Sequence, residues 1–371
     1  MEPKPGLADC LKRSFSWSVY ARFSGREHST GLISFAKRSS KDATSTTEKD
    51  ESPQIANPLL DAALKRSRSK YELDMRGLLS PPKELHGTNE TMGSSVNITV
   101  LQETVKELKW LTWLDISGNG LTELPESLGD LVKLTNLVVS ENELVALPRS
   151  ISKLKELATL SMEKNKIEEL PWGIAQCKAL TRLNGDYNNL QFLPDAVGKL
   201  SKLKTLSVHF NCLKSLPKSM ATMTCLVELD VKFNHLEDIP ENLCLATSLV
   251  RLNLASNFTN LRRLPESIGR LQNLRELDVS FNNLTCLPDS IAMLTNLQSL
   301  NLEGNPLLLP PLQIAEQGKE VVLNFMIKYV EQEKKMMKKR KISSLAKLVY
   351  KLLRMLKRRN GRVNGDLQLL A

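Results

Sequence analysis

Asparagine recurs along this chain at a fixed interval, and this period constrains the fold more than any other feature of the sequence. Seven asparagines lie 23 residues apart, and two more follow after intervals of 25 and 23 residues. They are Asn119, Asn142, Asn165, Asn188, Asn211, Asn234, Asn257, Asn282 and Asn305. A proline follows six residues after eight of them and eight residues after Asn257, where the loop Phe258–Arg263 carries two extra residues. Chance does not keep such a register, so the chain contains an internal repeat.

The unit around Asn142 indicates what each repeat folds into. Leu137 and Val139 alternate with polar residues, which is the period of a short strand with one buried face. After the asparagine, apolar residues come at every third position, which indicates 3₁₀-like turns. Pro148 falls where the strand has ended and no backbone donor is needed. We expect the asparagine amide to turn inward and to satisfy backbone groups of the adjacent coils.

A single coil of this length cannot bury its apolar face, whereas stacked coils share one continuous core. The period is that of leucine-rich repeats. The sequence therefore predicts an α/β fold, a leucine-rich-repeat solenoid (horseshoe) with a concave parallel β-sheet. A disordered N-terminal region and a basic helical C-terminal tail are expected to flank it.

Composition divides the chain into five segments. Residues 1–90 are rich in Ser, Thr and Lys and are predicted to be mostly disordered, with a short helix near Pro58–Met75. Residues 91–110 are predicted to form an N-terminal cap or a degenerate repeat. Nine repeats follow at 111–311, then a capping helix at 312–333 and a basic amphipathic tail at 334–371.

Several stretches resemble one family in particular. The consensus L-x-x-L-x-x-L-x-L-x-x-N-x-L-x-x-L-P resembles the Ras-group leucine-rich repeats. The runs AQCKALTRLNGDYNNLQFLPDAVGKL, FNHLEDIPENLCLATSLVRLNLASNFTNLRRLPESIGRL and EGNPLLLPPLQIAEQGKEVV resemble the plant intracellular Ras-group-related leucine-rich-repeat proteins. The resemblance covers about residues 95–330. It implies intracellular protein–protein interaction in signal transduction, by analogy with animal relatives that scaffold Ras pathways.

The sequence offers no catalytic or metal-binding motif. It lacks G-x-x-x-x-G-K-[ST], H-E-x-x-H and G-x-S-x-G, its four histidines are isolated, and its six cysteines form no C-x-x-C pair. Cys177 occupies the repeat position of Leu131 and Leu154, which favours core packing over a nucleophile. We therefore expect no enzymatic activity, no cofactor and no metal. Because the N-terminus has no apolar signal segment, a cytoplasmic location is expected.

The outward positions of the strands form columns across the repeats, and one column carries aromatic residues. Tyr187, Phe210 and Phe233 are expected to stand about one strand spacing (~4.8 Å) apart. Two compatible interpretations remain: the rings shield the strand ends by packing on one another, or they form a binding hot spot. The predicted protein-binding residues of the concave face are Arg182, Asp186, Tyr187, His209, Phe210, Glu228, Asp230, Lys232, Phe233, Asp278 and Phe281.

Gly185 departs from the repeat, because it occupies a position where an inward aliphatic residue belongs. Neighbouring side chains are expected to compensate for the missing volume. Altered curvature beside Tyr187 is the second interpretation.

Most of the positive charge belongs to the tail. Residues 334–362 contain thirteen Lys or Arg and no acid, whereas the whole chain carries +10. Leucines at helical spacing, among them Leu345, Leu348 and Leu352, oppose a cationic face of Lys347, Lys351, Arg354 and Arg358. This pattern is typical of a helix that binds an anionic membrane surface, calmodulin or an acidic partner. A helix that folds back on the solenoid is the structural alternative, and KKMMKKRK at 334–341 could serve nuclear import.

The sequence thus favours an intracellular scaffold that is monomeric and binds a protein partner on the concave sheet, with a small GTPase or its regulator as the candidate partner. The alternative is a peripheral membrane or calmodulin-responsive protein that acts through the tail. Nucleic acid is not an expected partner, because the basic segment has a leucine face and no interleaved aromatic residues.

Overall fold

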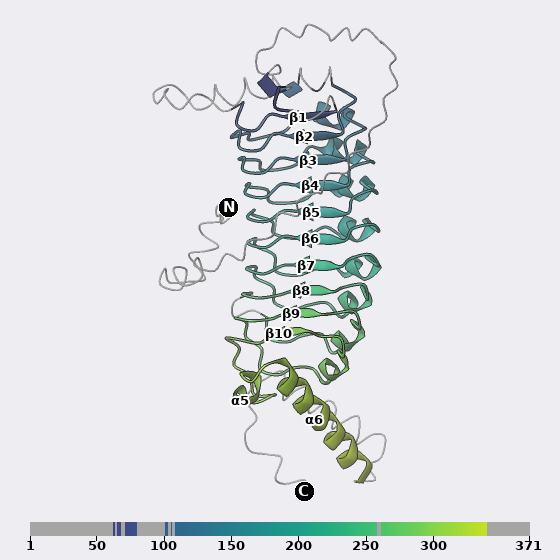
Figure 1. Ribbon diagram of the computed structural model, residues 1–371, viewed down its shortest axis with the longest axis vertical. Coiled ribbons are helices and arrows are strands. Elements are labelled where there is room, and N and C mark those ends of the chain that lie inside the picture. The colour runs from purple at the N-terminus through teal and green to yellow at the C-terminus, as the bar shows by residue number, and fades with distance from the viewer. Residues whose placement is uncertain are drawn as a thin grey trace, which may run out of the picture.

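The structure of the protein is a computed structural model, and it describes residues 62–63, 65–67, 71–79, 101–102, 105, 108–257 and 261–339. Within these residues ten strands form one parallel sheet in chain order (Figure 1). The strands are β1 Glu72–Asp74, β2 Trp113–Asp115, β3 Asn136–Val138, β4 Thr159–Ser161, β5 Arg182–Asn184, β6 Thr205–Ser207, β7 Glu228–Asp230, β8 Arg251–Asn253, β9 Glu276–Asp278 and β10 Ser299–Asn301. The fold is the predicted leucine-rich-repeat solenoid.

Short 3₁₀ helices form the opposite wall of the stack. They are η1 Glu126–Asp130, η2 Arg149–Lys153, η3 Trp172–Gln176, η4 Asp195–Lys199, η5 Lys218–Thr222, η6 Glu241–Leu245, η7 Ile268–Arg270 and η8 Asp289–Met293. The repeat proline immediately precedes seven of the eight, and the exception is η7, which lies in the coil with the two-residue insertion. Proline suits this position because its fixed φ begins a tight turn and it lacks an N–H that would need a partner.

One continuous apolar core fills the space between the sheet and the 3₁₀ helices. The central leucine of nearly every strand is buried, as Leu137, Leu183 and Leu229 illustrate, and so are the apolar residues that lead into each 3₁₀ helix. Because each coil covers the next, no coil carries a core of its own.

The asparagine ladder joins consecutive coils, as the sequence predicted. The Asn188 side chain is fully buried, and its Nδ2 donates to Met162 O of the preceding coil at 2.9 Å and to Gly185 O of its own coil at 3.1 Å. Its Oδ1 accepts a hydrogen bond from the Ile167 N–H at 3.0 Å. The other asparagines of the ladder repeat this pattern, as Asn142 and Asn234 show. Each amide therefore fixes the spacing of two coils.

The sheet begins one coil earlier than the repeat period predicted. β1 pairs in parallel with β2, and Leu73 and Met75 are fully buried. The nine-unit count missed this coil because Leu78 occupies the asparagine position. In the segment 91–110, which lies between β1 and β2 along the chain, the apolar residues Leu101, Val105 and Leu108 are buried in the core. This segment therefore belongs to the first coil and does not precede the sheet.

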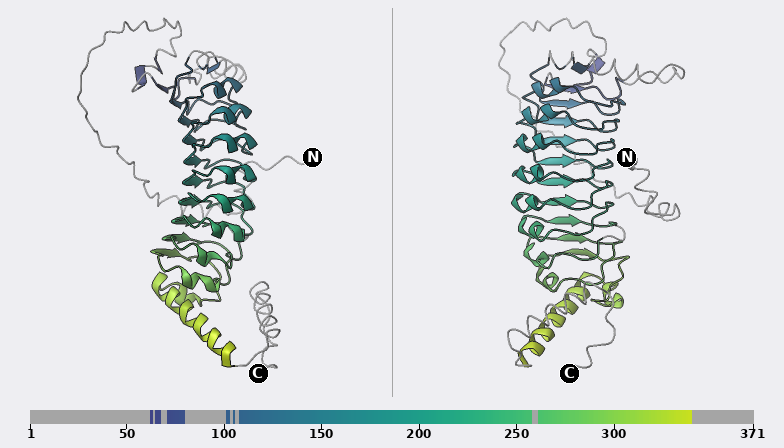
Figure 2. Two further views of the ribbon diagram at one scale, coloured as in Figure 1. Left: turned by 90° about the vertical axis from the view of Figure 1, so that its right-hand side faces the viewer. Right: turned by 180° about the vertical axis from the view of Figure 1, so that it is seen from behind.

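Up to residue 339, where the described part of the chain ends, two helices follow the last strand. α5 (Leu312–Ala315) is short, and α6 (Lys319–Lys339) leaves the end of the stack obliquely (Figure 2). Val322 and Met326 of α6 are buried against the core. The segment predicted as one capping helix at 312–333 is thus two helices, because Gly318 with its positive φ of 91° separates them, and the second helix extends six residues further.

A neighbouring side chain compensates for the missing side-chain volume at Gly185, as the first interpretation of the sequence predicted. A Cβ atom placed on Gly185 would lie 2.7 Å from Cε of Met162, the residue at the equivalent position of the preceding coil. Met162 is fully buried. Its long, flexible side chain therefore fills the volume that a branched aliphatic residue occupies in other coils.

Candidate protein-binding surface

Where a strand ends in Asp or Asn, that residue closes a local turn, which gives two predicted site residues a structural role. Asp230 Oδ1 accepts a hydrogen bond from the Lys232 N–H at 3.1 Å, and Asp278 Oδ1 accepts one from the Ser280 N–H at 2.9 Å. Asn184 makes the same contact with the Asp186 N–H at 3.1 Å. Sequence reasoning assigned this column only to binding, although its alternation of Asp and Asn is the signature of such turns. The side chains still face the solvent side of the sheet.

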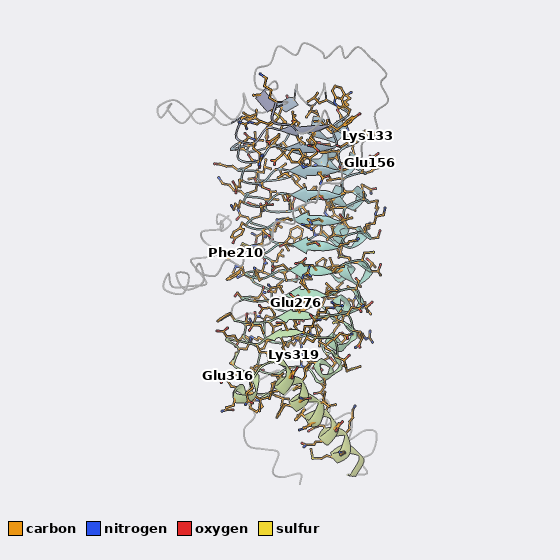
Figure 3. The ribbon with its side chains drawn as sticks, in the orientation of Figure 1. Lys133, Glu156, Phe210, Glu276, Glu316 and Lys319 are labelled. Atoms are coloured by element: carbon orange, nitrogen blue, oxygen red, sulfur yellow. The ribbon has the colours of Figure 1, made fainter. Side chains whose placement is uncertain are left out.

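Three aromatic rings form a continuous stack beside the ends of β5, β6 and β7. The Tyr187 and Phe210 centroids are 4.5 Å apart with ring planes 10° apart, and those of Phe210 and Phe233 are 4.1 Å apart with planes 12° apart. All three residues are half-buried. Figure 3 places Phe210 on the opposite side of the solenoid from Lys133 and Glu156, at the ends rather than the starts of the strands. We call Tyr187, Phe210 and Phe233 the aromatic stack.

Backbone geometry sets the direction of these rings. Tyr187, Phe210 and Phe233 have φ values of 54°, 51° and 52°, in the left-handed region that bulky side chains seldom adopt. Each N–H in this position donates to the next coil, as the Tyr187 N–H does to His209 O at 2.9 Å. The solenoid imposes the conformation on the whole column, so the rings project in parallel without choosing their own backbone angles.

A cluster of polar side chains borders the aromatic stack on the sheet face. His209 Nδ1 lies 3.0 Å from Asp186 Oδ2 and 3.9 Å from Asp230 Oδ2. The same Asp186 carboxylate accepts hydrogen bonds from Ser207 Oγ at 2.6 Å and from the His209 N–H at 2.9 Å. The His209 ring also meets Tyr187 edge to face at a centroid distance of 5.1 Å. We call Asp186, Ser207, His209, Asp230 and Lys232 the polar cluster.

The charges of the polar cluster are partly desolvated. Burial raises the pKa of Asp230 above its ordinary value, although Lys232 and His209 act in the opposite direction. Lys232 Nζ lies 3.6 Å from Asp230 Oδ2. Charges that are partly shielded from water interact more strongly with a partner than fully solvated charges do.

The remaining predicted residues of the sheet face do not join the cluster. Glu228 forms an ion pair with Arg251 at 2.7 Å, and Arg182 is exposed on β5. Phe281 packs on Gly304, where an added Cβ would approach its ring to 2.5 Å. Asp278 Oδ2 accepts a hydrogen bond from Asn301 Nδ2 at 3.3 Å. The aromatic stack and the polar cluster therefore contain seven of the eleven predicted residues, together with Ser207, which was not predicted. The other four predicted residues lie outside both groups.

The remaining candidates from the sequence are Cys177 and the basic tail. Cys177 is fully buried, its Sγ donates to Ile151 O at 3.3 Å, and burial raises its pKa to about 11, which agrees with core packing. The tail residues Leu345, Lys347, Leu348, Lys351, Leu352, Arg354 and Arg358 lie outside the described residues. Over the part of the chain that is described, no helix is long and apolar enough to cross a membrane, and no group of acidic, histidine and cysteine side chains could hold a metal ion.

Comparison with protein families matches the repeats. A leucine-rich repeat region model matches residues 140–255, and a leucine rich repeat model matches residues 109–167 and 247–307. With the ten-stranded sheet and the asparagine ladder, these matches show that the chain is a leucine-rich-repeat protein. No curated protein sequence matches it.

A solved structure of a plant receptor shares the fold. The leucine-rich-repeat ectodomain of the membrane receptor kinase GASSHO1/SCHENGEN3 from Arabidopsis thaliana, in complex with CASPARIAN STRIP INTEGRITY FACTOR 2, is 32% identical with a TM-score of 0.51. That match covers 55% of this chain and 25% of the receptor chain. The structure of PEPR1 with AtPEP1 is 32% identical with a TM-score of 0.48, covering 55% of this chain and 30% of the other. This chain thus spans about a quarter to a third of the receptor chains that it matches.

Proposed function

We propose that this protein is an intracellular scaffold that binds a protein partner on the sheet face of β5, β6 and β7. The observation that carries the proposal is the aromatic stack, half-buried and lying directly beside the polar cluster. Leucine-rich-repeat proteins with solved complexes, such as the receptor ectodomain bound to CASPARIAN STRIP INTEGRITY FACTOR 2, bind protein or peptide ligands, which supports the general role. No catalytic role is proposed.

The aromatic stack is suited to binding because its side chains are already fixed in position before a partner binds. Each ring is held by its neighbours and by an imposed backbone conformation, so little side-chain entropy is lost on association. Aromatic side chains are enriched in protein interfaces, and Tyr is among the residues that most often form their hot spots. The polar cluster supplies fixed donors and acceptors that orient the partner.

The resemblance to the plant intracellular Ras-group-related proteins supports a partner in signal transduction, with a small GTPase or its regulator as the candidate. The exposed Arg182 on β5 and the carboxylates of the polar cluster give this face both signs of charge. Such patterns select partners by complementarity more than by raw affinity.

The test is a triple substitution of Tyr187, Phe210 and Phe233 by alanine in the full chain. Binding to a partner isolated with the native protein is expected to weaken by at least a hundredfold, because hot-spot truncations cost about 2 kcal/mol or more each. Far-UV circular dichroism should change little, since the rings lie outside the core. The matched control is Trp172→Ala, which removes an aromatic side chain that is 67% exposed on η3. Normal binding by the triple variant would contradict the proposal.

The second candidate function, a membrane or calmodulin-responsive role of the tail, rests on the thirteen cationic residues of 334–362. It concerns a different part of the chain and is compatible with the scaffold role.

A further inference from the structure

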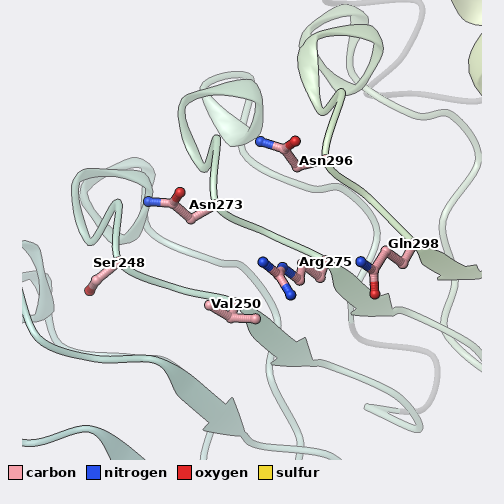
Figure 4. Close-up of a pocket in the computed structure, with 6 residues that line it drawn as sticks. All are labelled: Ser248, Val250, Asn273, Arg275, Asn296 and Gln298. Carbon is pink, nitrogen blue, oxygen red and sulfur yellow. The ribbon is translucent and has the colours of Figure 1, made fainter.

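A shallow polar pocket lies where β8, β9 and β10 begin, away from the strand ends that carry the aromatic stack (Figure 4). Its volume is about 450 Å³, and it is lined by Ser248, Val250, Asn273, Arg275, Asn296 and Gln298. These residues lie two and four positions ahead of the central leucines of three successive strands. The sequence-based predictions assigned no role to any of them.

Hydrogen bonds to the preceding coil hold one wall of the pocket. Asn273 Nδ2 donates to Thr247 O at 2.9 Å, and Asn296 Nδ2 donates to Gln272 O at 2.8 Å. Because each amide nitrogen is used in this way, the orientation of each amide group is set. The two Oδ1 atoms accept no hydrogen bond from the described residues, so they remain available to a donor in the pocket.

Arg275 supplies the positive charge of this pocket. Its side chain is exposed, and it forms no ion pair with any residue of the described ranges. The neighbouring Arg251, in contrast, is held by Glu228 at 2.7 Å. Figure 4 shows the Arg275 guanidinium above Val250, with the Gln298 amide on its other side. An unpaired guanidinium between neutral side chains presents its fork of donors to an incoming anion.

We propose that this pocket binds a carboxylate group of the partner, an inference that rests on the scaffold function above. Arg275 would donate two parallel hydrogen bonds to the carboxylate, which is the strongest geometry for this pair of groups. The free Oδ1 atoms of Asn273 and Asn296 would accept hydrogen bonds from backbone N–H groups that flank the carboxylate in a peptide. A doubly charged phosphate fits less well, because the pocket offers one cation and several acceptors.

The position of the pocket restricts the partner. Three strand steps separate β6, at the centre of the aromatic stack, from β9, which corresponds to roughly 15 Å at ~4.8 Å a step. An extended chain advances about 3.3–3.6 Å a residue. A partner that uses both sites in an extended conformation therefore carries its carboxylate about five or more residues from the group that contacts the aromatic stack. The carboxylate belongs either to an acidic side chain or to a free C-terminus.

The experiment uses the full chain and three N-acetylated peptides, so it needs no knowledge of the natural partner. Acetyl-Gly-Glu-Gly-amide presents an acidic side chain, acetyl-Gly-Gly-Gly with a free C-terminus presents a terminal carboxylate, and acetyl-Gly-Gln-Gly-amide is the neutral control. Binding is measured from the change of the peptide's own proton resonances on addition of protein. At least one acidic peptide is expected to bind with a dissociation constant on the order of 1 mM, whereas the neutral peptide should not.

Variants assign the binding to this pocket. Arg275→Gln should weaken binding of the acidic peptide about tenfold or more. Arg275→Lys should bind it with an affinity between those of the parent and Arg275→Gln, because lysine keeps the charge and cannot donate two parallel hydrogen bonds. Arg270→Gln is the matched control, since it removes an exposed arginine from η7, five residues before Arg275. The alanine triple variant of the aromatic stack should still bind the acidic peptide, which separates this inference from the scaffold proposal. Equal binding of the neutral peptide, unchanged binding by Arg275→Gln or no binding of either acidic peptide would overturn the inference.

Discussion

Single residues with a fixed orientation carry most of the specificity of this fold. The ladder asparagine shows this most clearly, because one amide group contacts backbone atoms of two coils. An aliphatic residue of similar size would leave several buried backbone groups without partners, and desolvated groups of that kind are costly. The residue is therefore required by the hydrogen-bonding needs of a polar backbone in a dry interior.

Replacing Asn188 by alanine is expected to lower the free energy of unfolding by ~1–3 kcal/mol, because the Ile167 N–H and the carbonyls of Met162 and Gly185 lose their partner. Urea unfolding of the full chain measures the effect. Asn242→Ala is the control, since Asn242 is exposed on η6. Equal unfolding midpoints for the Asn188 variant and the parent would show that the amide contributes nothing.

Gly185 and Met162 form a pair whose volumes are complementary, which suggests a test by exchange. Gly185→Val alone should destabilise the protein by about 1–3 kcal/mol, because its side chain would collide with Met162. Adding Met162→Val should restore much of the lost stability, since both positions would then match Val139 and Val208 of the neighbouring coils. Thermal unfolding of both single variants and the double variant gives the coupling, and additive effects would contradict it.

At the scale of the strand and its following turn, function and structure share the same residues. Asp230 closes its turn by accepting the Lys232 N–H and also belongs to the polar cluster. Asn184, Asn253 and Asn301 close the corresponding turns of other coils with an amide oxygen. A carboxylate is thus not needed for the turn, so the charge at Asp230 serves something other than the local fold.

The pH dependence of stability should expose this charge. Because burial raises the folded-state pKa of Asp230 above 3.8, the folded protein binds more protons than the unfolded chain between 3.8 and the raised value. Ionised Asp230 therefore destabilises the fold, and this penalty grows as pH rises through that window and is complete at neutral pH.

Asp230→Asn keeps the turn and removes the charge, so it is expected to raise the unfolding midpoint at pH 7 and to leave it nearly unchanged at pH 3. Urea unfolding at the two pH values measures the difference. Asp278→Asn is a control at the equivalent position of β9, where Ser280 and Asn301 already satisfy the carboxylate. A lower midpoint for Asp230→Asn at pH 7 would mean that its attraction to His209 and Lys232 outweighs its burial.

At the scale of the whole molecule, the two ends of the solenoid differ. The first coil retains the strand and lacks the asparagine, while its Leu79 N–H donates to Asn119 Oδ1 of the second coil at 2.8 Å. The last coil is covered by α6 through Val322 and Met326. Terminal coils have only one neighbour, so they tolerate departures from the repeat that an internal coil would not.

From Lys334, near the end of α6, the charge of the chain becomes strongly positive, and the part beyond Lys339 is predicted from sequence alone. A peptide of residues 334–362 is expected to sediment with anionic vesicles and not with neutral ones, because each surface Lys or Arg contributes about 1 kcal/mol. Binding should weaken steeply with salt, and calcium-loaded calmodulin should compete. A variant peptide with Leu345, Leu348 and Leu352 changed to serine tests the apolar contribution. If the parent peptide ignores both vesicles and calmodulin, its leucines are better assigned to contacts within the protein.

The sequence by itself determined the repeat fold, the parallel sheet and the inward asparagines, because each of these follows from a local rule repeated at a fixed period. It also identified the column that contains Tyr187, Phe210 and Phe233. It missed the coil of β1, since Leu78 removes the period's marker there, and it gave no sign of the pocket around Arg275.

Only the tertiary structure decided how residues of different coils meet. The ring stacking, the placing of His209 between two carboxylates and the filling of the Gly185 gap by Met162 all involve residues about 23 positions apart. Periodicity predicts that such residues are neighbours, but side-chain direction depends on the backbone angles and volumes of both coils. Those are set only when the coils stack.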